Sequence, residues 1–318
     1  MLSALLFAFN ITMPNLLLMA LGVFMQKRQV VNDNFVNTAS HIVFNYSLPC
    51  LLFFSVLKSE INISEQINLL GTGFLVTFLL YFLAELYAYF FVKDIKDKGV
   101  FVQAIFRSNM AIIGLATVVN AYGEMGMSMG AVYMGVITIL YNVLSVICLS
   151  RTDTKSTGFQ QKAVGMTTKM AKNPLIIALV SAFAYKFLGL PMLPEFITKT
   201  GQLVGAVALP LALICAGASM DLKTMFQLSG VSMQASIGRI LFAPLIAVAF
   251  GMAFALTPVQ FGVLFIMVAS PVAAASYVMA KAMGGNDILA ANILAFTTVF
   301  SMVGMGVGIA VLRTVGLV

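Results

Sequence analysis

The stretch FRSNMAIIGL at residues 106–115 places a charge, two polar side chains and a glycine inside a long apolar run. A second stretch, VASPVAAASY at residues 268–277, places a proline and several small residues inside another. Position 270 less 161 is position 109, so the two interruptions lie at matching points of the two halves of the chain. A proline kink or a small-residue packing face would explain either stretch alone. As a matched pair they predict two broken membrane helices, one in each half, whose backbone groups need partners inside the membrane.

The composition around these stretches is that of a membrane protein. Of the 318 residues, 61% are hydrophobic and 9% are charged, whereas roughly a quarter of the residues in an ordinary soluble domain are charged. A single soluble core could not bury this much apolar surface. The apolar runs are continuous and do not alternate, so they predict helices and not the strands of a membrane barrel.

Charged residues divide the chain into runs of the length that a membrane helix needs, which is about 20 residues. We therefore expect an all-α membrane protein with ten transmembrane helices, in which the fourth and ninth are broken. Their expected positions are 3–26, 35–57, 67–92, 99–121, 127–150, 170–190, 199–220, 229–255, 259–282 and 287–313.

The basic residues are unevenly divided between the two sides that ten helices would define. Twelve Lys and Arg residues lie in loops after odd-numbered helices, and four lie on the other side. Because cytoplasmic loops carry the excess of Lys and Arg, we expect a multi-pass protein of the cell inner (plasma) membrane with both termini extracytoplasmic. The net charge of +7 is thus an orientation signal, and it does not predict nucleic-acid binding.

Three pairs of residues indicate an internal repeat. They recur at an offset of 160 or 161, and they are Leu48-Pro49 with Leu209-Pro210, Pro14 with Pro174, and Gly123 with Gly284. Chance could supply any one pair, because Pro and Gly are frequent in membrane helices. With five helices per copy the second copy would insert upside down, which gives the 5+5 inverted repeat of many secondary transporters. We assign residues 1–150 to the first repeat, 151–172 to a cytoplasmic linker and 173–318 to the second repeat.

Five segments, in their order and spacing, resemble the auxin efflux carrier family. They lie at residues 45–53, 107–115, 172–174, 209–219 and 270–272. The resemblance implies a ten-helix inverted repeat in which helices 4 and 9 cross at their breaks and hold the substrate. It also implies a likeness to the bacterial members, among which are permeases for malate and malonate. Family members often have a proline where this chain has Ala116, so the break in helix 4 would depend on Asn109 and Gly114.

The two breaks supply most of the candidate substrate-binding residues. Asn109 has both a donor and an acceptor, so it can bond an anion or cap a freed backbone group. Pro271 and Ser270 would form the gap in the second half, with Ser270 also a candidate substrate contact. For Asn45, lining the site and bonding between helices are equal alternatives. The full set is Asn109, Ser270, Pro271, Asn45, Gly114, Ser276, Tyr277, Tyr141 and Asn142.

Four further side chains carry or accept charge inside the expected helices. Arg107 lies about 12 Å inside its helix by helical rise, where an unpaired cation is costly. We expect Arg107 and Arg239 to attract anions at a cytoplasmic vestibule, with Glu85 as a candidate partner of Arg239. Glu85 and His41 are candidates for proton coupling, although a surface-reaching carboxylate and a packing histidine are the simpler interpretations.

These features predict a secondary transporter that moves a small organic anion, such as malate, malonate or an auxin-like acid, by alternating access where helices 4 and 9 meet. Its partners would be that carboxylate and the lipid bilayer, and a homodimer is left open. The alternative is a membrane-embedded carboxylate sensor on a transporter-like fold. No nucleotide-binding loop, catalytic pair or metal-ligand spacing is visible in the sequence, so we expect neither an enzyme nor a cofactor or metal.

Overall fold

The chain is described here from a computed structural model, which covers residues 2–58, 63–152, 172–191, 193–220 and 229–318. The regular secondary structure of these residues is helical, apart from one isolated β-bridge between Ser108 and Val272. The all-α prediction is confirmed for this part of the chain, whereas most of the linker predicted at 151–172 lies outside it.

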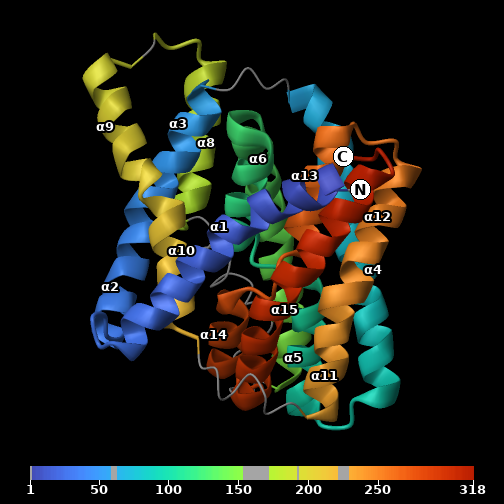
Figure 1. The fold of residues 1–318 in the computed structure, drawn as a ribbon. Helices are drawn as coiled ribbons and strands as arrows, with labels where there is room; N and C mark the ends of the chain where they lie inside the picture. The colour runs from blue at the N-terminus through green and yellow to red at the C-terminus, as the bar shows by residue number, and fades with distance from the viewer. Residues whose placement is uncertain (1, 59–62, 153–171, 192, 221–228) are drawn as a thin grey trace.

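The elements follow the apolar runs of the sequence (Figure 1). In chain order they are α1 (Leu2–Lys27), α2 (Asp33–Ile42), η1 (Val43–Ser47), α3 (Leu48–Lys58), α4 (Ile63–Phe91), α5 (Ile95–Phe106), η2 (Met110–Gly114), α6 (Leu115–Leu149), η3 (Ser150–Thr152), α8 (Pro174–Phe187), α9 (Glu195–Ala206), α10 (Ala208–Ala218), α11 (Gly230–Ile237), η5 (Gly238–Phe242), α12 (Ala243–Ala253), α13 (Pro258–Ala269), α14 (Ala274–Ala282) and α15 (Asp287–Thr314).

Seven helices in the described residues are long and apolar enough to cross a membrane. They are Ser3–Lys27, Asp33–Lys58, Gln66–Phe91, Met110–Leu149, Glu195–Ala218, Gly230–Ala253 and Asp287–Thr314, and α8 and α13 are shorter apolar helices. The difference from the ten expected spans has local causes. The fourth expected span is divided between α5 and η2–α6, the ninth is divided between α13 and α14, and α8 begins at Pro174, four residues after the predicted start.

The longest of these helices cannot be one straight span. Met110–Leu149 has 40 residues, which would extend about 60 Å at 1.5 Å per residue, twice the thickness of a bilayer core. Gly123, with φ 59° and ψ −139°, interrupts it. Only glycine adopts such a conformation at little cost. Gly284, its partner in the expected repeat, also has a positive φ, of 77°.

Prolines coincide with three of the other irregular points in the helices. The π-helical turn η1 directly precedes Leu48-Pro49, and η5 precedes Pro244 in the same way. A proline ring clashes with the carbonyl four residues earlier in a regular helix, and a wider turn relieves that clash. Between α9 and α10 the helix is interrupted at Val207, shortly before Leu209-Pro210. The expected pair of Pro14 and Pro174 differs in its place in the helix, because Pro14 lies inside α1 whereas Pro174 begins α8.

The helices form two groups (Figure 1). One contains α1, α2, α3, α8, α9 and α10, whose main contacts are α1 with α10 and α3 with α8 and α9. The other contains α4, α5, α6 and α11 to α15, in which α5 packs on α4 and α6, and α13 packs on α6 and α12. Contacts of α1 with α6 and α15, and of α3 with α6, join the two groups. The two termini lie near each other at one end of the molecule.

Small residues allow the closest helix contact in the first group. A Cβ atom added at Gly22 of α1 would lie 2.0 Å from the carbonyl oxygen of Ile214, and one added at Gly217 of α10 would lie 2.0 Å from that of Met19. Without a hydrophobic driving force between helices in lipid, such close backbone approach is a main source of association. The outer surface carries many exposed large apolar side chains, among them Phe82, which suits lipid and not water.

Candidate functional site

The two predicted interruptions are present, and they lie against each other. α5 ends at Phe106 and η2 begins at Met110, while α13 ends at Ala269 and α14 begins at Ala274. The N–H of Asn109 donates to the Pro271 carbonyl at 2.7 Å, and the N–H of Ala273 donates to the Arg107 carbonyl at 3.2 Å. The intervening residues pair like two very short antiparallel strands, which satisfies backbone groups that a membrane would leave unpaired. We call residues 107–109 and 270–273 the paired breaks.

Four helix termini meet at the paired breaks, and the two that are N-termini, those of η2 and α14, have no side-chain cap. In α2, α5, α8, α11, α13 and α15 a side chain of the N-cap residue accepts a hydrogen bond from the first turn. At Asn109 before η2 and at Ala273 before α14 no side chain does so. The first turn of α14 is also accessible, because Ala274 and Ala275 are exposed. Uncapped N–H groups at a helix N-terminus favour a negatively charged ligand.

Arg239 lies against the opposite termini. Its side chain is fully buried, its Nε donates to the Ser270 carbonyl at 2.9 Å, and its Nη1 donates to the Ile105 carbonyl at 2.7 Å. One guanidinium thus bonds the C-terminal ends of both α5 and α13, where the helix dipoles are negative. Gly238 permits this approach, because a Cβ there would come within 2.9 Å of the Ile105 side chain. Arg239 thus lies inside the protein, and the attraction of anions at a cytoplasmic vestibule that was expected for it stays a prediction.

Arg107 is also buried, and it is held by α6 and α14. Its Nη1 donates to Ser145 Oγ at 2.9 Å and to Met279 Sδ at 3.3 Å, and its Nη2 donates to Asn142 Oδ1 at 2.9 Å. The side chain is only 6% exposed, so Arg107 lies inside the protein, and the attraction of anions expected for it stays a prediction. In the part of the chain that the structure describes, neither Arg107 nor Arg239 forms an ion pair with a carboxylate.

Asn109 and Gly114 flank the start of the second half-helix. Asn109 is partly exposed, and its carbonyl accepts the N–H of Gly114 at 3.1 Å. A Cβ at Gly114 would lie 3.0 Å from both Ser270 Oγ and Met267 Sδ. Glycine therefore lets η2 approach α13 this closely without displacing either side chain.

Ser270 and Pro271 have structural contacts. Ser270 is fully buried, and its hydroxyl donates to the Ile266 carbonyl of its own helix at 2.8 Å. Pro271 is buried and presents its carbonyl to Asn109. The next N–H, that of Val272, donates to Thr297 Oγ1 of α15 at 3.3 Å.

The remaining candidates near the breaks come from α6 and α14. Tyr141 is buried, and its hydroxyl lies 3.1 Å from Ser108 Oγ, while Asn142 of the same helix holds Arg107. Ser276 of α14 is 4% exposed, and its hydroxyl has no hydrogen-bond partner among the described residues. Tyr277 is half-buried and lies beneath Lys281, whose Nζ is 5.9 Å from the ring centroid.

A comparison with protein families identifies this architecture. The family described as Membrane transport protein matches residues 8–308, nearly the whole chain. The chain belongs to this family. It is the auxin efflux carrier-like family that the sequence motifs resemble, so the chain is a membrane transporter. No curated protein matches the chain in a direct sequence search.

Three candidate residues of this transporter are not brought to the paired breaks by any contact seen in the structure. Asn45 donates to the His41 carbonyl of its own helix at 2.8 Å, and the η1 turn that carries it packs on α8, α9 and α10. His41 is exposed and faces the ring of Tyr46. Glu85 forms an ion pair with Arg151, so the suggested pairing of Glu85 with Arg239 is wrong.

Sequence reasoning missed a polar cluster between α1 and α6. Asn15 Nδ2 donates to Thr117 Oγ1 at 2.8 Å, and Asn120 Nδ2 donates to Asn15 Oδ1 at 3.1 Å and to the Ile11 carbonyl at 3.1 Å. Asn15 is 2% exposed. Buried asparagines in a membrane helix need such partners, and this requirement is the signal that could have singled out Asn15. The cluster joins the two helix groups at the start of α6, just after η2 and the paired breaks.

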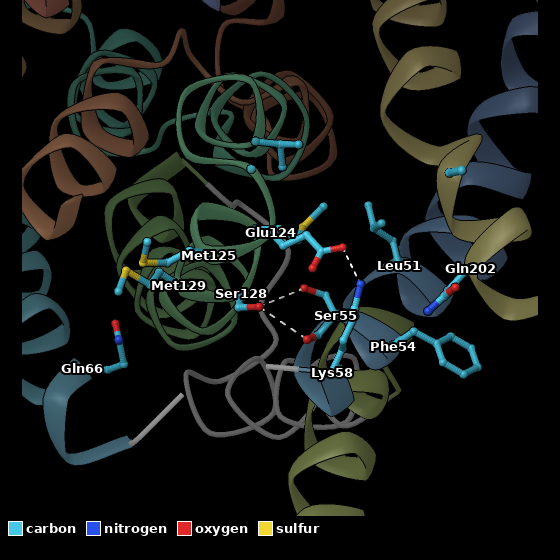
Figure 2. Close-up of a pocket in the computed structure, with 14 residues that line it drawn as sticks. Leu51, Phe54, Ser55, Lys58, Gln66, Glu124, Met125, Ser128, Met129 and Gln202 are labelled. Atoms are coloured by element: carbon cyan, nitrogen blue, oxygen red, sulfur yellow. Dashed lines mark hydrogen bonds and ion pairs between the residues drawn. The ribbon is translucent and has the colours of Figure 1, made fainter. Parts of the chain in front are cut away.

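A separate cavity of about 720 Å³ opens between the two groups of helices (Figure 2). None of the candidate site residues predicted from the sequence lines it. Its walls come from α3, α6, α9 and the start of α4, and they are Leu51, Phe54, Ser55, Lys58, Gln66, Val119, Gly123, Glu124, Met125, Met127, Ser128, Met129, Gln202 and Ala206.

Proposed function

We propose that this transporter is a secondary transporter that moves a small organic anion by alternating access, with the anion held at the paired breaks. The observation that carries the proposal is the arrangement of charge there. Two helix N-termini without side-chain caps meet beside a buried Arg107 that has no carboxylate partner among the described residues. A site of this kind favours a ligand that brings negative charge with it.

The balance of charge supports the proposal. A helix terminus is equivalent to about half an elementary charge. On that scale the two C-termini carry about −1, which the +1 of Arg239 offsets, while the two N-termini and Arg107 together leave about +2. A carboxylate satisfies both the N–H donors and the surplus of positive charge, so malate, malonate or an auxin-like acid is a suitable class of substrate.

The arrangement of helices supports a ten-helix, 5+5 inverted repeat. The paired breaks lie at matching positions of the two halves, and Gly123 and Gly284, 161 residues apart, both have positive φ. We propose that α4, α5, α6 and α11 to α15 move as a unit against α1, α2, α3, α8, α9 and α10. The positive-inside rule would then place both termini on the extracytoplasmic side of the cell membrane.

Reconstitution tests this function. Purified protein in liposomes is expected to give saturable carboxylate uptake and counterflow, and binding without flux would instead favour a sensor. Asn109→Ala and Pro271→Ala should strongly reduce flux while inserting normally. Matched controls are Asn68→Ala, an exposed asparagine of α4, and Pro258→Ala, which lies at the first turn of α13. Wild-type kinetics in both test variants would exclude the paired breaks from the mechanism.

A further inference from the structure

The cavity in Figure 2 is lined by part of α6, the helix that follows η2 and so leads away from the paired breaks. Its lining includes Val119. Val119 lies ten residues along η2 and α6 from Asn109, a distance of about 15 Å by helical rise. Its mouth lies beside Lys58 at the end of α3 and Glu124 just after the bend at Gly123. The cavity is thus positioned between the surface and the proposed anion site. The charge asymmetry of the loops assigns this surface to the outside.

Two polar contacts across the cavity connect α3 to α6 (Figure 2). Lys58 Nζ and Glu124 Oε1 are 2.6 Å apart, and Ser55 Oγ and Ser128 Oγ are 3.3 Å apart. The spacings of three residues on α3 and four on α6 place each pair on one helix face. These contacts join a helix of one group to a helix of the other, so they must open when the groups move apart.

The ion pair is one that a ligand can exchange. The Lys58 and Glu124 side chains are 60% and 79% exposed, and ion pairs this exposed to water contribute little net stability. A carboxylate entering the cavity can therefore replace Glu124 as the partner of Lys58. The released Glu124 remains solvated.

Another polar group that lines the cavity, Gln66, has an acceptor without a partner among the described residues. Gln66 at the start of α4 is 1% exposed, and its Oε1 accepts no hydrogen bond from any described residue. In the view of Figure 2 it lies on the opposite side of the cavity from Lys58, with Met125 and Met129 between. A buried acceptor without a donor is costly, so a ligand with a hydroxyl or N–H group would be stabilised there.

We propose that this cavity is a second binding site for the transported acid, through which it passes between the extracytoplasmic surface and the paired breaks. Lys58 binds the carboxylate, the wall of Met, Leu and Phe side chains holds an apolar body, and Gln66 accepts a hydrogen bond from a hydroxyl or N–H of the ligand. The inference rests on the proposed function and narrows the substrate to an organic acid with an apolar body and one donor.

The sequence provides a clean reporter, because the chain contains no tryptophan. Met125 lines the cavity and is 54% exposed, so Met125→Trp places a single indole there with room for the larger ring. Its fluorescence in detergent would be titrated with 4-hydroxyphenylacetate and with phenylacetate, which lacks the hydroxyl. We expect saturable changes, with the hydroxylated acid binding about two- to tenfold more tightly, as one hydrogen bond allows.

Variants in the Met125→Trp background assign the roles. Lys58→Gln should weaken binding about tenfold or more, whereas Glu124→Gln should tighten it about two- to fivefold because Lys58 loses its competitor. A misfolded protein would not give that gain. Gln66→Leu should abolish the preference for the hydroxylated acid, and Asn109→Ala should lose flux but keep the fluorescence response.

Two results would overturn the inference. One is the absence of saturable fluorescence change in Met125→Trp, and the other is unchanged affinity in both Lys58→Gln and Glu124→Gln. Either result leaves the proposed function standing if the wild-type protein still carries carboxylate in liposomes. Failure of the wild type to carry any carboxylate would remove the function itself.

Discussion

Arg239 offers the strongest test of how the paired breaks are held together. Its guanidinium donates to Ile105 O at 2.7 Å and to Ser270 O at 2.9 Å, and its Nη2 has no partner among the described residues. Replacing it with methionine keeps a long apolar side chain but removes both hydrogen bonds and the positive charge. The two carbonyls would then be left buried and unpaired at the negative ends of two half-helices.

The expected loss follows from these contacts. An unsatisfied buried acceptor costs about 1–3 kcal/mol, so two would cost about 2–6 kcal/mol. Part of this cost is offset, because the variant no longer buries a charged guanidinium whose Nη2 has no partner among the described residues. We therefore expect Arg239→Met to lower the free energy of unfolding by about 3 kcal/mol. Arg239→Lys keeps the charge but cannot reproduce the planar fork, and it should lose about half as much.

Unfolding in mixed micelles of increasing SDS content would measure these differences, and liposome flux would be recorded for each variant. Arg313→Met is the matched control, because Arg313 lies exposed near the end of α15 over the ring of Phe7 and should lose no more than about 1 kcal/mol. Wild-type stability of Arg239→Met would show that the guanidinium does not hold the two half-helices, and the reasoning would be refuted.

Three further substitutions test close contacts. Gly114→Ala should destabilise by about 1–3 kcal/mol and reduce flux, because its Cβ would lie 3.0 Å from two side-chain atoms of α13; normal flux with normal stability would contradict this. Asn15→Leu should cost about 1–3 kcal/mol in SDS unfolding, because Thr117 and Asn120 of α6 each lose one hydrogen bond and keep only those to the Ile113 and Ile11 carbonyls, and an unchanged midpoint would count against it. Gly22→Ala should disrupt the contact of α1 with α10, since its Cβ would lie 2.0 Å from a backbone oxygen, and recovery of monodisperse protein would report it. Gly71→Ala is the matched control, because a Cβ there meets nothing within 4 Å.

Much of the fold follows from local features of the sequence. Continuous apolar runs predict helices, and glycine at 123 permits the bend that a helix of this length requires, whereas the start of α8 at Pro174 was predicted four residues too early. The interruption around Asn109 was visible because a charge and two polar residues are rare in an apolar run. It is present even with Ala116 where the family often has proline, because the pairing with residues 270–273 supplies hydrogen bonds that one helix alone lacks.

The roles of the charged residues could not be predicted in the same way. Arg239 bonds carbonyls that are 134 and 31 residues away in sequence, and nothing in its immediate neighbourhood reveals those partners. Glu85 was paired with the wrong arginine for the same reason, since its partner Arg151 is 66 residues away. The cavity of Lys58, Glu124 and Gln66 was missed because its polar residues lie at helix ends, where charged side chains ordinarily face water.

The polarity of the paired breaks explains why the site should select anions and not cations. A pair of broken helices brings two positive and two negative termini together, and by itself it has no preference. Arg239 donates to carbonyls at the two negative C-termini, those of α5 and α13, so a cationic ligand would find those carbonyls already bonded. The positive pair has no side-chain cap, although most of the described helices that start at a loop have one. The proposed preference for negative charge would thus arise because the chain neutralises one end of the dipole arrangement and leaves the other for a ligand.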